Sequence, residues 1–170
     1  MKRATKIAKR PATRAGKPVR ARAVPGDPVA ATRAAGELYF QAWVARDLER
    51  ILALHTPDSD FVLHGADGVQ VWRGIEAVRQ IFDLILRSLP DQTFDVQSMV
   101  VKEDFLVAHS IVTATLVLPW PMGGRTYLPS GRAIQFEIVD IWHFQGDRIR
   151  VKEGWLDAMA MHNQLTQSGN

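Results

Sequence analysis

Large apolar side chains recur at every second position along residues 131–144, and this alternation predicts a long β-strand with one buried face. Asp140 has the same parity as the apolar residues, so its carboxyl group is predicted to face the core. A carboxylate without a partner is unfavourable in such surroundings. The apolar residues that define the buried face are Ile134, Phe136, Ile138, Trp142 and Phe144.

The position of Asp140 allows three interpretations. It could be a structural acid whose oxygens are satisfied by backbone groups or by a tyrosine. It could be a catalytic carboxyl group at the base of an apolar pocket, where burial favours the protonated form. A β-bulge could also reverse its parity and expose it. The alternation alone leaves these interpretations open.

The rest of the chain predicts helices followed by strands. Apolar residues at helical spacing indicate helices over residues 32–46, 48–55 and 73–88, and a short helix or irregular tail over 158–165. Strands are expected over residues 61–64, 69–72, 93–102, 105–118 and 148–157, with a turn at 56–59 and a loop at 119–129. This order predicts an α+β domain in which the helices pack on one face of a curved antiparallel sheet.

A turn at residues 145–147 joins the long strand to the last strand and suggests a register. If Phe144 pairs with Ile149, Asp140 lies opposite Glu153 on the buried face. Two facing carboxylates cannot both ionise easily, so one would hold a proton and could act as a general acid. The alternative is a bulge that turns Glu153 outward. The remaining pairs of this register are Trp142 with Val151 and Ile138 with Trp155.

Three further side chains could take part in chemistry. Tyr39 lies on the apolar face of the first predicted helix, where its hydroxyl group could donate into a pocket. His64 ends a short strand before a glycine-containing turn. His109 shares the parity of the apolar residues of its strand, so it could face inward. For each of the three, a structural role in the core is the alternative.

The sequence lacks the patterns of several other kinds of site. It has no cysteine, which excludes disulfides and thiolate ligands. The five histidines show no metal-binding spacing, and there is no phosphate-binding glycine loop or nucleophile elbow. These residues therefore predict no metal site and give no support to nucleotide chemistry or serine hydrolysis. No apolar run is long enough to span a membrane, and a cytoplasmic location is predicted.

Charge is distributed unevenly along the chain. Residues 1–26 contain nine of the 21 basic residues and no acid, whereas the other 12 basic and all 18 acidic residues give residues 27–170 a formal charge of −6. The basic segment has almost no large apolar side chains, so it is predicted to be a disordered tail. It could contact nucleic acid weakly through phosphates, but a solvated extension without a partner is the favoured interpretation.

Several short motifs have an order and spacing that resemble those of a known family. They are Ala45-Arg46-Asp47-Leu48, Trp72-Arg73-Gly74, Leu89-Pro90-Asp91, residues 128–132, residues 139–149 and Glu153-Gly154-Trp155. Through them the chain resembles the cystatin-like, nuclear-transport-factor-like cone fold and, within it, the SnoaL-like polyketide cyclases. Ketosteroid isomerase and scytalone dehydratase are more distant relatives. The resemblance implies one SnoaL-like domain over residues 27–170, with the N-terminal helices on the concave face of a cone-shaped antiparallel sheet.

The resemblance also implies roles for individual residues. Asp140 matches the general acid/base of the SnoaL-like cyclases, and Tyr39 matches the oxyanion-hole tyrosine of ketosteroid isomerase. His64 lies near the position of the isomerase's general base, so that base is replaced or shifted here, which argues against authentic steroid isomerisation. The interval before Glu153 is longer than is usual in the family, which leaves its placement open. Members of the family use no metal or cofactor for this chemistry and often form homodimers through the sheet.

The expected function is acid/base catalysis on a small hydrophobic, ketone-bearing molecule of polyketide or steroid type, as in a cyclase, isomerase or dehydratase. The predicted catalytic residues are Asp140, Tyr39, His64 and His109. The alternative is a non-catalytic ligand-binding or assembly module on the same fold. The residues predicted to contact the substrate are Trp43, Phe61, Phe82, Phe136, Ile138, Trp142, Glu153 and Trp155.

Overall fold

The computed structural model describes residues 26–167. The helices are α1 (Pro28–Val44), α2 (Leu48–Ala53), α3 (Ile75–Ser88) and α4 (Ala158–Thr166). The strands are β1 (His55–Gly65), β2 (Gly68–Arg73), β3 (Thr93–Val101), β4 (Phe105–Thr115), β5 (Trp120–Met122), β6 (Arg125–Tyr127), β7 (Ala133–Gln145) and β8 (Arg148–Leu156). The predicted tail, residues 1–26, lies outside the described residues except for Gly26.

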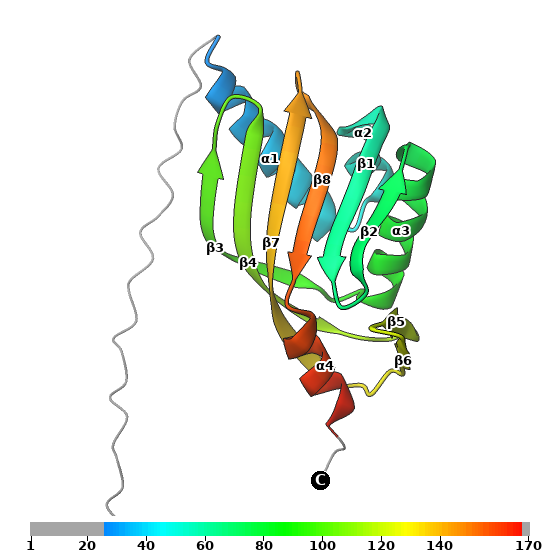
Figure 1. The fold of residues 1–170 in the computed structure, drawn as a ribbon. Coiled ribbons are helices and arrows are strands. Elements are labelled where there is room, and N and C mark those ends of the chain that lie inside the picture. The colour runs from blue at the N-terminus through cyan, green and yellow to red at the C-terminus, as the bar shows by residue number, and fades with distance from the viewer. Residues whose placement is uncertain (1–25, 168–170) are drawn as a thin grey trace, which may run out of the picture.

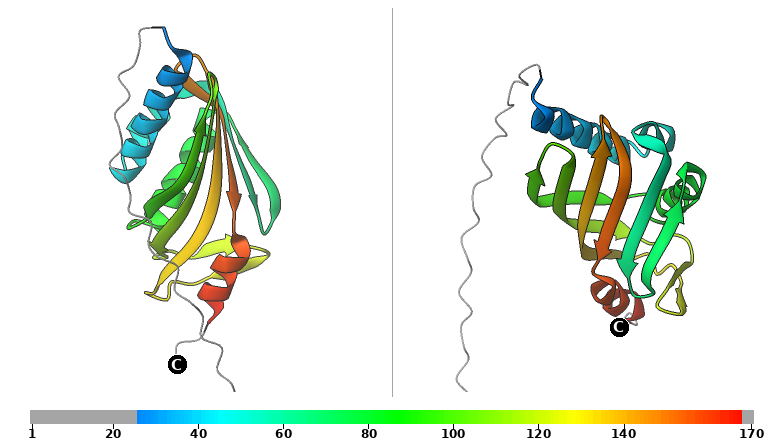
Figure 2. Two further views of the ribbon diagram at one scale, coloured as in Figure 1. Left: turned by 90° about the vertical axis from the view of Figure 1, so that its left-hand side faces the viewer. Right: turned by 45° about the horizontal axis from the view of Figure 1, so that its top comes forward.

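Six strands form one curved sheet in the order β2-β1-β8-β7-β4-β3 (Figure 1). All neighbouring strands are antiparallel except β1 and β8, which are parallel. Helices α1 and α3 lie on the same side of this sheet (Figure 2). The predicted α+β architecture, with helices packed on a curved and mostly antiparallel sheet, is confirmed. The predicted four-stranded meander forms one side of the sheet, and the β1–β2 hairpin extends it.

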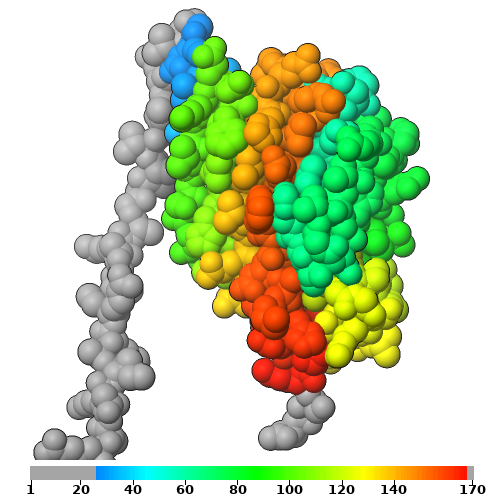
Figure 3. Space-filling view, viewed as in Figure 1, coloured from blue at the N-terminus to red at the C-terminus, as the bar shows by residue number. Residues whose placement is uncertain are grey.

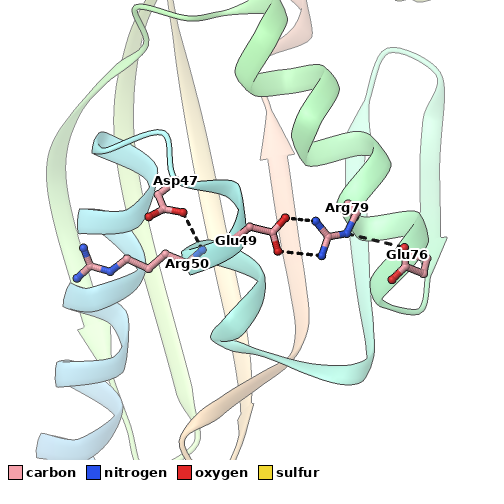
Figure 4. A network of polar contacts seen from close by, with 5 residues as sticks. All are labelled: Asp47, Glu49, Arg50, Glu76 and Arg79. Carbon is pink, nitrogen blue, oxygen red and sulfur yellow. Dashed lines mark hydrogen bonds and ion pairs between the residues drawn. The ribbon is translucent and has the colours of Figure 1, made fainter.

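Local sequence explains where the first helices begin. Asp27 accepts hydrogen bonds from the backbone N–H groups of Val29 and Ala30, and Pro28 occupies the first turn, so α1 starts earlier than residue 32. Asp47 caps α2 in the same way through the N–H group of Arg50 (Figure 4).

A network of exposed charges joins α2 to α3 (Figure 4). Arg79 of α3 binds both carboxylate oxygens of Glu49 in α2, and its Nε atom lies 3.8 Å from Glu76. The pairing lowers the pKa of Glu49, because Arg79 donates hydrogen bonds to the carboxylate and its charge favours the ionised form. Exposed pairs of this kind contribute little to stability, so the network orients the two helices rather than holding the fold together.

Two predicted irregular segments are more regular in the structure. Residues 56–59 were expected to form a turn, but they belong to β1, where the pairing with β8 is interrupted between His55 and Asp60. The loop predicted over residues 119–129 contains the small hairpin of β5 and β6. Asp67 accepts hydrogen bonds from the N–H groups of Gly123 and Gly124, which fixes this hairpin against the β1–β2 turn.

The register of β7 and β8 differs from the predicted one by a single residue. Phe144 pairs with Ile149 as predicted, but His143 then pairs with Val151, so Arg150 is an extra residue in a β-bulge. Every later pair is shifted: Trp142 lies opposite Lys152, Asp140 opposite Gly154, Ile141 opposite Glu153 and Val139 opposite Trp155. The predicted pairing of Asp140 with Glu153 is therefore wrong, and the bulge is the alternative that the structure supports.

The core lies between the helices and the concave face of the sheet. Its largest fully buried members include Tyr39, Ile51, Phe82 and Leu106. A second apolar cluster lies where α4 and the β5–β6 hairpin meet β4 and β7. The described residues form no helix with both the length and the apolar character needed to cross a membrane.

Candidate functional site

A cavity of about 90 Å³ lies inside the cone, between α1, α3 and the concave face of the sheet. This is several times the roughly 10–15 Å³ that one enclosed water requires. Its walls are almost entirely apolar or aromatic. Six of the residues predicted to contact a substrate line it: Trp43, Phe61, Phe82, Phe136, Ile138 and Trp142.

Asp140 lines this cavity and is buried, with 6% of its surface exposed. Its inward orientation follows from its parity in β7, which pairs with β4 without any irregularity. Its Oδ1 atom lies 2.5 Å from the Nζ atom of Lys152, which is equally buried. Asp140 is thus neither exposed by a bulge nor satisfied by backbone or tyrosine groups alone, because its partner is a buried ammonium group.

Lys152 is held over two aromatic rings as well as beside Asp140. Its Nζ atom lies 4.9 Å from the ring centroid of Phe61 and 5.5 Å from that of Trp142. Such contacts stabilise a cation that has lost its water. The cavity therefore contains an ion pair in a shell of low polarity, where electrostatic interactions are much stronger than in water.

Tyr39 brings a phenol from α1 to the same cavity. Its ring packs edge-on against Trp142, with 5.7 Å between centroids. Its hydroxyl group is buried without a hydrogen-bond partner, as are the indole N–H groups of Trp43 and Trp142. Burial raises the pKa of Tyr39 well above its usual range; the Asp140 carboxylate adds to this, whereas the two nearby indole groups act in the opposite direction. Tyr39 is therefore a neutral hydrogen-bond donor at physiological pH.

His55 lies beside the cavity, at the start of β1. Its ring packs against Tyr39 and Phe82, and its Nδ1 atom lies 2.8 Å from the hydroxyl oxygen of Ser59. Burial lowers the pKa of His55 to about 3, and the positive charge of Lys152 contributes to the same shift. His55 is therefore neutral, and its ring packs behind Tyr39 and Phe82, two residues that line the cavity.

The other predicted catalytic residues lie on the opposite face of the sheet, which we call the outer face. Here His64 stacks on Trp155 with 3.7 Å between ring centroids, and His109 lies 2.8 Å from a Glu137 oxygen. The expectation that His109 faces inward is wrong, because the buried residues of β4 are those of the other parity. The apolar residues that share its parity, Phe105, Val107 and Ile111, are only half-buried and lie on the outer face with it.

Glu153 and Trp155 also lie on the outer face and do not line the cavity. Glu153 contacts His64 at 3.4 Å and His143 at 3.0 Å through its two oxygens. Their predicted contact with a substrate in the cone followed from the register without a bulge, and the bulge at Arg150 reverses it. Among residues 26–167, no three histidine or acidic side chains gather as metal ligands would.

Residues 37–151 match the sequence model of the SnoaL-like domain family. The protein belongs to this family. Its structure resembles a SnoaL-like protein from Jannaschia sp. CCS1, provisionally described as a polyketide cyclase, with a TM-score of 0.73, 18% identity and coverage of 84% of this chain and 97% of the other. No curated protein matches the sequence significantly.

Two Streptomyces proteins have the same fold as this SnoaL-like protein. IdmH from Streptomyces antibioticus, provisionally described as a polyketide cyclase, gives a TM-score of 0.64 at 21% identity, over 80% of this chain and 99% of IdmH. AclR from Streptomyces galilaeus, provisionally described as a hydroxylase, gives 0.66 at 20% identity, over 84% of this chain and 89% of AclR. At these identities the likeness establishes the fold alone.

Sequence reasoning missed Lys152, the residue that most changes the chemistry of this SnoaL-like domain. Nothing in the spacing of residues around it marks an inward-facing amine, because a regular strand would place Lys152 on the outer face. Two observations together could have indicated it. Asp140 faces inward and needs a partner of opposite charge, and a shift of one residue in the register of the next strand turns Lys152 to the same face.

Proposed function

We propose that the cavity is an acid/base site for a small hydrophobic, ketone-bearing molecule of polyketide or steroid type, on which the protein acts as a cyclase, isomerase or dehydratase. One observation carries this proposal: Asp140 and Tyr39 both line one apolar cavity, and the hydroxyl group of Tyr39 is buried without a hydrogen-bond partner. A buried hydroxyl group without a partner lowers the stability of the fold. A ligand oxygen that accepted its hydrogen bond would remove this cost.

In the proposed mechanism Asp140 accepts a proton from the carbon next to the substrate carbonyl group. Tyr39 donates a hydrogen bond to the oxygen on which negative charge develops, and the apolar walls strengthen that interaction. Neither His64 nor His109 takes part, because both side chains lie on the outer face. Trp43, Phe61, Phe82, Phe136, Ile138 and Trp142 would contact the body of the substrate.

The test is exchange of the α-protons of a small cyclic ketone, 2-tetralone, for deuterium, followed by NMR. We expect Tyr39→Phe and Asp140→Asn to slow exchange by about 100-fold or more, the usual scale for loss of a general acid or base. Glu137→Gln, which removes a carboxylate from the outer face, is the control and should leave the rate unchanged. Exchange that is equally fast in all four proteins would contradict the proposal.

The ion pair itself favours a second candidate function, a non-catalytic carrier of hydrophobic ligands. Asp140 is already bound by Lys152, and a carboxylate engaged in this way is less available as a base. A carrier would bind the ketone, quench the fluorescence of Trp43 and Trp142, and keep its affinity in the Asp140→Asn variant while showing no exchange. The enzyme is supported instead if the wild-type protein exchanges the protons of the ketone, whereas the Tyr39→Phe and Asp140→Asn variants bind the ketone without exchanging them.

We also propose that the protein forms a homodimer through the outer face. In the described part of the chain this face is free of helices apart from α4 at one end (Figures 2 and 3), and it exposes Val69, Val71 and Trp155. Trp155→Glu should yield a monomer in light-scattering measurements of molar mass. Leu38→Glu, at an exposed position on α1 in the helix layer, is the control and should not change the molar mass.

A further inference from the structure

Lys152 carries the one amine among the described residues that line the cavity. We propose that this amine captures the carbonyl group of the ligand covalently, as an imine. The inference rests on the proposed function, since it concerns the same cavity and the same ketone or aldehyde substrates, but it adds a nucleophile and a covalent intermediate to it.

The stability of the fold does not explain why a lysine is buried here. A buried ion pair is often no more stabilising than apolar residues of similar volume. The bulge at Arg150 is what turns Lys152 into the cavity, and bulges frequently re-aim a side chain next to an active site. The chain thus departs from a regular strand at the residue that brings an amine into an apolar cavity.

The contacts of Lys152 leave room for a ligand atom at the nitrogen. An ammonium group has three N–H donors. One reaches Asp140, and Nζ also lies over the rings of Phe61 and Trp142, which do not accept hydrogen bonds as an oxygen atom does. Because Lys152 lines the cavity, a carbonyl group bound there would lie beside its side chain.

Asp140 is placed to accept the ammonium proton and to return it when water leaves. It first accepts a proton from the ammonium group, which gives a neutral amine and a carboxylic acid. The amine nitrogen forms a bond to the carbonyl carbon, and the displaced C=O π electrons become a lone pair on oxygen, which takes a proton from the nitrogen. Asp140 then protonates the resulting hydroxyl group, which leaves as water while the nitrogen lone pair forms the C=N bond.

The product keeps the charges of the starting pair. The iminium group carries the positive charge that the ammonium group had, and Asp140 is again a carboxylate beside it, so the apolar shell surrounds the same ion pair as before. The iminium group acidifies the neighbouring carbon, from which Asp140 can now accept a proton to leave an enamine. The almost entirely apolar lining of the cavity also disfavours the water that would hydrolyse the imine.

The test is reductive trapping with sodium cyanoborohydride and 2-tetralone, read by mass spectrometry of the intact protein and its peptides. Wild-type protein should gain the mass of the ketone less one oxygen atom, on Lys152. Lys152→Arg keeps a cation beside Asp140 but has no nucleophilic amine, so the adduct should fall to background. Lys102→Met, which removes an exposed lysine, is the control and should trap as the wild-type protein does.

The deuterium exchange described above separates this inference from the proposed function. Loss of both trapping and at least 100-fold of the exchange rate in Lys152→Arg supports imine formation. If Lys152→Arg exchanges as fast as the wild-type protein, or if only exposed lysines are trapped, the imine is wrong and acid/base catalysis stands. If wild-type protein neither exchanges nor traps any ketone that quenches its fluorescence, both proposals fail.

Discussion

The ion pair between Asp140 and Lys152 is the feature whose disruption the structure predicts most sharply. Each residue is 6% exposed, and Nζ lies 2.5 Å from Oδ1. Asp140→Leu would leave an ammonium group inside an aromatic shell, and Lys152→Met would leave a carboxylate there. Removal of one member of a buried pair typically costs about 3–5 kcal/mol of unfolding free energy, and we expect each single variant to lose this amount.

Replacing both residues should have a very different effect. In Asp140→Leu/Lys152→Met no charge stays buried, and the cavity offers space for the added methyl groups. Substitution of a buried pair by apolar residues is commonly neutral or stabilising by about 1–4 kcal/mol. The double variant should therefore be at least as stable as the wild-type protein, although it should neither trap a ketone nor exchange its protons.

Urea unfolding at pH 7 and thermal melting would measure these differences. For a domain of this size, the single variants should melt roughly 10–20 °C lower than the wild-type protein. The exposed pair of Glu49 and Arg79 (Figure 4) provides the matched control, because Glu49→Leu, Arg79→Met and their combination should all melt close to the wild-type temperature. Single variants within about 1 kcal/mol of the wild-type protein, or a double variant with the summed loss, would refute the reasoning.

Three further predictions concern single residues around the cavity and the core. Tyr39→Phe removes a buried hydroxyl group without a partner, so unfolding in urea should show a gain of about 1–3 kcal/mol; a loss would mean that this group is satisfied. His55 has a pKa of about 3 in the folded protein and 6.5 as its ordinary value, so only the unfolded chain binds a proton between these values and stability falls as the pH drops below 6.5. Between pH 7 and pH 5 the wild-type protein should lose about 2 kcal/mol more than His55→Gln, and equal losses would contradict the assignment. Gly36→Ala would drive a methyl group into the buried Leu106 side chain and should cost about 1–3 kcal/mol, whereas Gly65→Ala, with ordinary contacts, should cost less.

The sequence predicts β7 and the orientation of Asp140 correctly, for a physical reason. One face of this strand packs on the helices, and its pairing with β4 runs from Ala133 to His143 without a shift. Under those conditions the period of two is a reliable guide, since each residue's face is fixed by its parity. The first and third helices are also predicted, because their apolar positions follow the helical repeat, although α1 begins at Pro28, before the predicted start at residue 32.

The bulge in β8 is not predictable from the strand itself, because its cause lies elsewhere in the chain. The guanidinium group of Arg150 contacts Asp58 at 3.2 Å and Asp60 at 3.7 Å, both in the irregular part of β1. The interruption in β1 and the extra residue in β8 therefore face each other across a parallel pair of strands. Neither segment, read alone, indicates that the other departs from regular pairing.

The outer face explains why the pattern of apolar residues could not reveal the shift. In a strand with one apolar and one polar face, a shift of one residue would expose every apolar side chain to solvent. The apolar pattern of such a strand would therefore exclude the wrong register. Here the outer face is itself rich in apolar side chains, among them Val139, Ile141 and Val151, which are half-buried. In β8, Ile149, Val151 and Trp155 share one parity although Val151 and Trp155 lie on the outer face, so the apolar pattern of this strand favours the register without a bulge. The surface that we propose for a second copy of the chain is, for this reason, also what conceals Lys152 in the sequence.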